Sequence, residues 1–204
     1  MNLRVPMMLF AVVLIATAAF GQAIGPADAQ QVRYASNLNV GDSVINITNA
    51  GSTGGGNLCA NVYTFSPDEQ LISCCACVVT PDALVSLSAR ADLISNTLTP
   101  AVPNSIVVKI IATSGGACNA SGVTAGALAS GLRAWGTTLH ANQPVPAAPA
   151  VNTYAVTETE FSKADLSQAE LTRNTAYCGF IQANGSGFGI CRSCRLGGQG
   201  AVKQ

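Results

Sequence analysis

Charged side chains are scarce in this 204-residue chain, at 10% of its residues, against roughly 25% in ordinary soluble domains. Basic and acidic residues number ten each, so the formal net charge is zero. A chain with no excess of positive charge lacks the electrostatic footprint of proteins that bind nucleic acids or anionic membranes. We therefore expect neither partner. Zero net charge instead favours self-association.

Histidine is almost absent, since His140 is the only one. Any Ser-His-Asp or Cys-His arrangement would depend on it, yet it directly precedes a proline-rich segment and is interpreted as a surface residue. Glu158 and Glu160 share one face of an expected strand and could imitate the carboxylate pair of a glycosidase. Solvated acids on an exposed strand are the simpler interpretation. We expect no enzymatic activity, no cofactor and no metal.

A long apolar run occurs only at the N-terminus, where Arg4 precedes residues 5–20. This run is shorter than the roughly 20 apolar residues that a membrane-spanning helix needs. The small residues Ala27-Asp28-Ala29 follow it, in the order that is typical of a secretory signal. Residues 1–29 are therefore predicted to be a signal peptide, and the protein to be secreted to the extracellular space or cell surface without a stable membrane span.

Cleavage is predicted after Ala29, with cleavage after Gly21 or Ala23 as the alternatives. The predicted signal contains one basic and one acidic residue (Arg4 and Asp28), which leaves nine of each. The net charge of the mature chain therefore stays at zero.

Eight cysteines follow the predicted signal, and an even number in an exported chain predicts disulfide bonds. A four-thiolate zinc site is the first alternative, because a Cys-x-Cys and a Cys-x-x-Cys pair supply its ligands. A redox-active Cys-x-x-Cys is the second. The disulfide candidates are Cys59, Cys74, Cys75, Cys77, Cys118, Cys178, Cys191 and Cys194.

Three of these cysteines lie in one apolar run, residues 71–79. If the run is a strand, Cys75 and Cys77 face one side of it and Cys74 faces the other. Cys74 and Cys75 should therefore bond to different partners. The spacing leaves open whether Cys191 and Cys194 close a small ring or each reach elsewhere.

Strand signals dominate the rest of the chain, with β-branched and alternating residues between turn residues. This pattern predicts a mainly β, sandwich-like single domain over residues 42–204. The expected strands are 42–49, 57–65, 70–80, 83–94, 105–113, 132–140 and 152–161.

One helix is expected near residues 167–184. Ser167 and Glu170 form a capping box, and Asn184-Gly185 is a typical helix end. Leu171, Cys178 and Ile181 then fall near one helical face. Cys178 on that face predicts that a disulfide attaches the helix to the β core.

Three Asn-x-Ser/Thr sequences match the N-glycosylation pattern, at Asn46, Asn119 and Asn184. We treat these residues as glycosylation candidates. Attached sugars would cover part of a surface that is poor in charge.

Several motifs together resemble an uncharacterised family of secreted, cysteine-rich bacterial proteins. They are Gly-Asn-Leu-Cys-Ala at 56–60, Cys-Cys-Ala-Cys at 74–77, Gly-Leu-Arg-Ala-Trp-Gly-Thr at 131–137, Phe-Ile-Gln at 180–182 and Asn-Gly-Ser-Gly at 184–187. The resemblance implies export and a shared fold, and it assigns no site residues. A second, architectural resemblance is to pilin-like subunits of extracellular fibres.

We expect a secreted structural protein that assembles with itself into an extracellular fibre. Residues 30–41 would form an N-terminal arm that is donated as a strand to a neighbouring copy. The alternative is a monomeric extracellular module that binds a carbohydrate or another ligand through Trp135 and Tyr154, although a lone tryptophan is most often a core residue.

Overall fold

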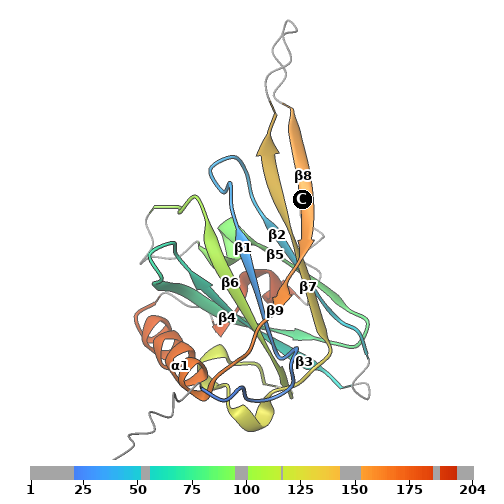
Figure 1. Ribbon diagram of the computed structural model, residues 1–204, viewed down its shortest axis with the longest axis vertical. Helices are drawn as coiled ribbons and strands as arrows, with labels where there is room; N and C mark the ends of the chain where they lie inside the picture. Colours follow the sequence, from blue (N-terminus) through green and yellow to red (C-terminus); the bar gives the residue numbers. More distant parts are fainter. Residues whose placement is uncertain are drawn as a thin grey trace, which may run out of the picture.

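The computed structural model describes residues 21–51, 56–94, 101–115, 117–142, 153–185 and 189–196. Within these ranges the chain forms two β-sheets and one long helix. Figure 1 shows helix α1 outside the two layers of strands. The fold is mainly β with one C-terminal helix, as predicted. The apolar run at 5–20 and most of the proline-rich segment lie outside the described residues.

The larger sheet has the strand order β10-β4-β3-β6-β1-β9. Its four long strands are antiparallel to their neighbours, whereas the short β10 is added parallel to β4. Both of its edges are two-residue strands, and such short edges limit pairing with other chains. The strands are β1 (Gln30–Ala35), β3 (Leu58–Phe65), β4 (Leu71–Val79), β6 (Ile106–Ser114), β9 (Ser162–Lys163) and β10 (Gly189–Ile190).

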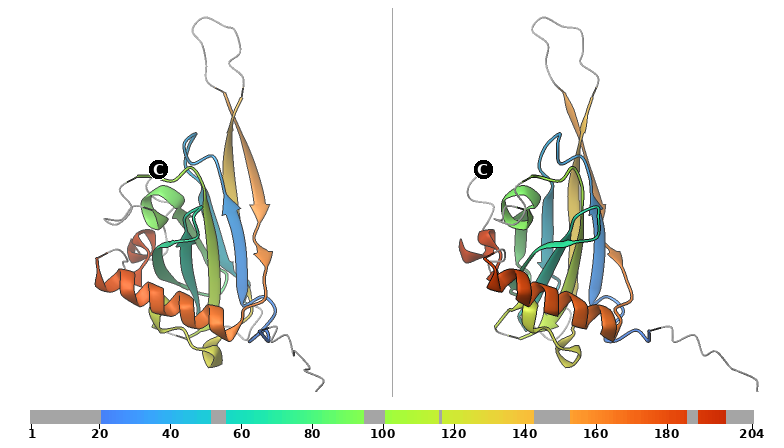
Figure 2. Two further views of the ribbon diagram at one scale, coloured as in Figure 1. Left: turned by 60° about the vertical axis from the view of Figure 1, so that its left-hand side comes forward. Right: turned by 90° about the vertical axis from the view of Figure 1, so that its left-hand side faces the viewer.

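The smaller sheet has the order β5-β2-β7-β8 and is antiparallel throughout. Strands β7 and β8 form a hairpin that extends beyond the body of the domain (Figures 1 and 2). The strands are β2 (Val44–Asn49), β5 (Leu84–Ser88), β7 (Leu132–Ala141) and β8 (Tyr154–Glu160).

The main core lies between the two sheets and is almost entirely aliphatic. Ile45 and Ile47 alternate with half-buried neighbours along β2, as expected for a sheet with one fully buried face. Strand β3 is buried at seven of its eight positions because its other face is covered as well. The larger sheet therefore separates two apolar layers.

Helix α1 (Gln168–Ala183) covers the second face of the larger sheet (Figure 2). Ser167 accepts the backbone N–H of Glu170 through its hydroxyl, which confirms the predicted N-cap. Leu171, Cys178 and Ile181 are buried as expected, and Cys178 forms a disulfide with Cys74 on β4. In the described part of the chain, no helix has the length and apolar character needed to cross a membrane.

The expected strand 83–94 is wrong in its second half. Strand β5 ends at Ser88, and a five-residue π-helical segment, Ala89–Leu93, follows. The Ser88 hydroxyl accepts the N–H of Ala91, while the Asp92 carboxylate accepts the N–H of Ser88. These side-chain bonds offer the backbone an alternative to the strand ladder, and they leave Ala91 exposed rather than on an apolar face.

Residues 30–41 do not form an arm apart from the domain. Strand β1 pairs with β6 along all six residues and with β9 on its other side. The segment ahead of β1 also packs against the domain. Ile24 donates its backbone N–H to Leu166 at 2.7 Å, and Ala112 donates to the carbonyl of Ala29 at 2.8 Å. Ala29 is 1% exposed, so the predicted cleavage position lies inside the folded structure.

Candidate functional site

A pocket of about 580 Å³ opens between helix α1 and the larger sheet. One wall is the turn at 66–69 that links β3 to β4, together with Phe65. The sheet contributes Val107 and Lys109 of β6, and Tyr34 of β1 lies at its margin. Its volume is within the range of small-molecule sites. This pocket is the strongest candidate ligand site among the described residues.

The helical wall of the pocket follows from helix geometry. Arg173, Asn174 and Tyr177 line it, because residues three or four apart lie on one side of a helix. Asn174 is 1% exposed, whereas Tyr177 is 53% exposed. The helix therefore presents one buried amide at the inner end of the wall and an aromatic ring nearer to solvent.

Charge within the pocket is balanced. The Lys109 ammonium lies 2.5 Å from a Glu170 carboxylate oxygen and 5.0 Å from the centre of the Phe65 ring. Lys109 and Glu170 therefore form an ion pair. Arg173 and Glu69, which also line the pocket, have no ion-pair partner among the described residues. Their charges are opposite. With Glu170 counted, which pairs with Lys109 but does not itself line the pocket, the charges at the site sum to zero.

Asn174 has an unused hydrogen-bond donor. Its amide nitrogen Nδ2 is buried and has no partner within the described structure. A buried donor without a partner costs about 1–3 kcal/mol. A half-turn of the terminal amide exchanges its nitrogen and oxygen, so this buried position beside the pocket can hold either a donor or an acceptor.

The aromatic residues of the alternative ligand site do not come together. Cross-strand pairing places Trp135 opposite Glu160 and Asn46, and Ala141 opposite Tyr154, all on the outer face of the smaller sheet. Six residue steps along β7 therefore separate Trp135 from the position of Tyr154, which is roughly 20 Å along a strand. Trp135 is half-buried on that outer face rather than in the core.

The candidate acids and the histidine lie on the projecting hairpin. Glu158 and Glu160 are exposed on β8, on the same outer face. The Asn46 amide donates to Glu158 at 3.5 Å. The ring nitrogens of His140 lie 2.9 Å from the Thr157 hydroxyl and 3.4 Å from the Asn37 amide. The histidine thus bridges neighbouring segments through polar contacts.

All eight cysteines are paired in disulfides. Cys74 and Cys75 bond to different partners, as predicted, because their side chains enter opposite layers of the core. Neither Cys191 nor Cys194 closes a ring with the other. The pairs are Cys59–Cys118, Cys74–Cys178, Cys75–Cys191 and Cys77–Cys194.

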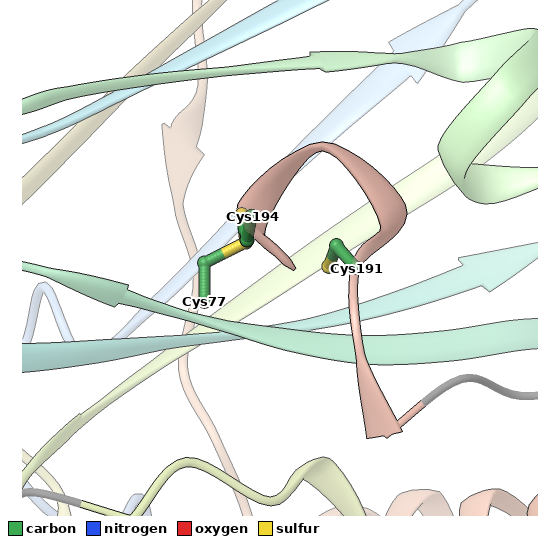
Figure 3. Close-up of side chains that lie close together, drawn as sticks. All are labelled: Cys77, Cys191 and Cys194. Atoms are coloured by element: carbon green, nitrogen blue, oxygen red, sulfur yellow. A yellow bond between two sulfur atoms is a disulfide. The ribbon is translucent and has the colours of Figure 1, made fainter. Parts of the chain in front are cut away.

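The four cysteines of the zinc alternative are the members of two adjacent disulfides. Figure 3 shows Cys194 bonded to Cys77 on β4, with Cys191 next to them. The sulfurs of these three residues lie within 4.8 Å of one another. With every sulfur in a disulfide, the oxidised chain offers no thiolate for zinc or for a redox Cys-x-x-Cys.

The three glycosylation candidates lie in different structural environments. Asn46 lies within β2 and accepts the Ser86 hydroxyl at 2.7 Å. Asn119 is exposed and accepts the backbone N–H of Ser121. Asn184 caps α1 and donates to the carbonyl of Phe180 at 2.7 Å, while the serine of its sequon, Ser186, lies outside the described residues.

Strand β8 presents an open edge. All seven of its residues are exposed, and no strand of the described chain pairs with its outer side. Phe161 donates its N–H to Ala134 at 2.8 Å, and Asn142 donates to Thr153 at 3.0 Å. In an antiparallel ladder this pattern directs the backbone groups of odd-numbered residues toward β7. Those of Tyr154, Val156, Glu158 and Glu160 therefore point to the open edge.

A buried arginine holds β1 against the smaller sheet. Arg33 is 6% exposed, and its guanidinium donates to the hydroxyls of Thr159, Thr138 and Ser43. No carboxylate pairs with it among the described residues. Burial therefore lowers the pKa of Arg33. Nothing in the sequence marks this contact beyond an arginine in an alternating strand.

Comparison of the chain with protein-family models, curated proteins and solved structures found no match. Its class is therefore defined by its own fold, a disulfide-linked two-sheet β domain with a C-terminal helix. The resemblance to secreted, cysteine-rich bacterial proteins stays a prediction.

Proposed function

We propose that the protein is an exported structural subunit that associates with copies of itself through the open edge of β8. The observation that carries the proposal is the seven-residue exposed edge on a hairpin that extends beyond the body. An exposed edge strand is a template for pairing with another chain. The zero net charge of the chain removes long-range repulsion between copies.

The sequence of β8 suits antiparallel pairing with a second β8. In a pair centred on Thr157, each Glu158 lies opposite Val156 of the other copy, and each Glu160 lies opposite Tyr154. No carboxylate then faces a carboxylate, and two exposed apolar residues gain cover. Such opposite pairs are the unit of sheet stabilisation. The result is a two-fold dimer with one continuous sheet.

Fibre formation by strand donation would pair β1 with a neighbouring copy rather than within its own chain. A donated strand would take the place between β6 and β9 that β1 of the same chain occupies here. It would also have to bring its own Arg33 to the hydroxyls of Thr138 and Thr159. Edge pairing through β8 needs no such exchange, and for this reason we place the first contact between copies at β8.

Export is part of the same proposal. Four disulfides are compatible with an oxidising compartment. Because residues 23–29 pack against the domain, we place signal cleavage after Gly21. The glycosylation candidates then lie on an exported surface.

Sedimentation velocity of the purified mature protein tests the association. We expect a dimer or larger species at micromolar concentration. Glu158→Pro removes an outward N–H that β7 does not use, so it should give a folded monomer. Glu158→Thr keeps the N–H and serves as the matched control, with association retained. A wild-type protein that stays monomeric, or Glu158→Pro that associates like wild type, would exclude this edge.

A further inference from the structure

The pocket beside α1 combines two exposed aromatic rings with a set of polar groups. Tyr34 is 61% and Tyr177 is 53% exposed, and both line the pocket. An exposed tyrosine offers a flat apolar face together with a polar tip. Such faces suit the C–H surface of a ring-shaped ligand that is otherwise hydrophilic.

The balance of charge in this pocket selects against a strongly ionic ligand. Lys109 is neutralised by Glu170 at 2.5 Å, and the exposed side chains of Arg173 and Glu69 carry opposite charges. With these charges balanced, the site has no excess charge of either sign to attract a strongly ionic ligand. The site therefore favours a neutral molecule rich in polar groups.

The hydrogen-bonding groups call for a ligand that both donates and accepts. Nδ2 of Asn174 lacks an acceptor and is closed to solvent, so a ligand group reaches it once the side chain turns toward the pocket. The Glu69 carboxylate only accepts. The hydroxyls of Ser66 and Ser105, which also line the pocket, can do either. Neighbouring hydroxyls on a sugar ring supply donors and acceptors at adjacent atoms, so one ring satisfies several of these groups.

From these features we infer that the pocket between α1 and β6 binds a neutral saccharide. Tyr177 and Tyr34 contact the ring faces, and Asn174 anchors a hydroxyl at the inner end. This site is separate from the β8 edge: its residues come from β1, the end of β3, the turn at 66–69, Ser105, β6 and α1. Binding here does not depend on self-association.

Isothermal titration with cellotriose, maltotriose and triacetylchitotriose tests the inference, with trigalacturonate and a neutral tripeptide as comparisons. We expect at least one neutral trisaccharide to bind with a Kd in the millimolar range or below. The two comparison compounds should bind at least tenfold more weakly.

Single substitutions test whether the saccharide binds in this pocket. Tyr177→Ala removes an exposed ring and should weaken binding at least tenfold, as should Asn174→Leu, which keeps the volume but removes the amide. Phe180→Ala is the matched control: it lies on the same helix, is 66% exposed and does not line the pocket, so affinity should not change.

Three results would overturn the inference. They are no binding of any neutral trisaccharide, tighter binding of trigalacturonate or the tripeptide, and binding that Tyr177→Ala leaves unchanged. Because Tyr177 is largely exposed, that variant is expected to fold even if Asn174→Leu does not.

Discussion

The carboxylate of Asp28 accepts a hydrogen bond from the guanidinium of Arg133 at 2.9 Å, which joins the segment ahead of β1 to strand β7. The backbone N–H of Gly131 also donates to Asp28, at 3.3 Å. Cleavage after Ala29 would remove this carboxylate. Asp28 therefore behaves as a residue of the folded domain.

The first prediction concerns processing. Cleavage after Gly21 preserves the bridge between Ala23 and Ser167 and the bond from Ile24 to Leu166. Mass spectrometry of the exported protein should therefore find Gln22 as the first residue. A mature chain that begins at Gln30 would contradict this assignment.

The second prediction is a pH dependence of stability at Asp28. Burial acts to raise the pKa of this carboxyl, but the hydrogen bonds from Arg133 and Gly131 together outweigh it and lower the pKa. Since the folded pKa lies below the unfolded one, the stabilisation is present above the unfolded pKa and is lost as pH falls through the folded pKa.

Asp28→Asn tests this dependence by urea unfolding. At pH 7 the variant should be less stable by about 1 kcal/mol. The difference should shrink toward zero as pH falls below about 4, where the unfolded carboxyl is protonated. A difference that stays constant with pH would show that the charge of Asp28 is irrelevant.

The third prediction concerns the space beside Gly136 that the Arg33 guanidinium occupies. A Cβ at Gly136 would lie 2.9 Å from the guanidinium carbon of Arg33, closer than real contacts allow. Gly136→Ala should displace the buried guanidinium and destabilise the fold by about 2 kcal/mol. Gly126→Ala is the control, because nothing lies within 4 Å of its added Cβ. Equal melting temperatures for the two variants would contradict the packing at Arg33.

The fourth prediction distinguishes the disulfide pattern from its alternatives. Denatured wild-type protein should contain no titratable thiol. Replacing Cys74 and Cys178 together with alanine removes a bonded pair and should leave none. Replacing Cys75 and Cys178 should leave two, on Cys74 and Cys191. Two free thiols in the first variant would refute the Cys74–Cys178 bond, and thiols in the wild type would revive the metal alternative.

Much of the fold is predictable because its signals are local. The cap at Ser167 and the end at Asn184-Gly185 fix α1 to within a residue. Alternation along 71–79 predicts the two faces that separate Cys74 from Cys75. The π-helical segment after Ser88 is not predictable from alternation alone, because Asp92 competes with the strand ladder through its side chain.

The candidate site could not be predicted from local sequence patterns. Its walls come from residue 34, residues 65–69, the β6 strand and α1, and only the folded chain brings them together. Trp135 is predicted to bind a ligand in the alternative function, although a lone tryptophan is most often a core residue, and its strand parity places it half-buried on the outer face. Residues 30–41 are predicted to form an arm because their alternation is weak, and this weak alternation reflects the burial of both sides of β1.

The most direct test of the central claim is a cysteine cross-link across the proposed β8 pair. In a pair centred on Thr157, the two Thr157 residues form a non-hydrogen-bonded pair with Cα atoms about 4.5 Å apart, which a disulfide can span. The two Ala155 residues would lie four positions out of register and beyond its reach. The account predicts that Thr157→Cys, run on a non-reducing gel, gives a covalent dimer and that Ala155→Cys does not. A Thr157→Cys protein that stays monomeric, or equal dimer from both variants, would contradict it.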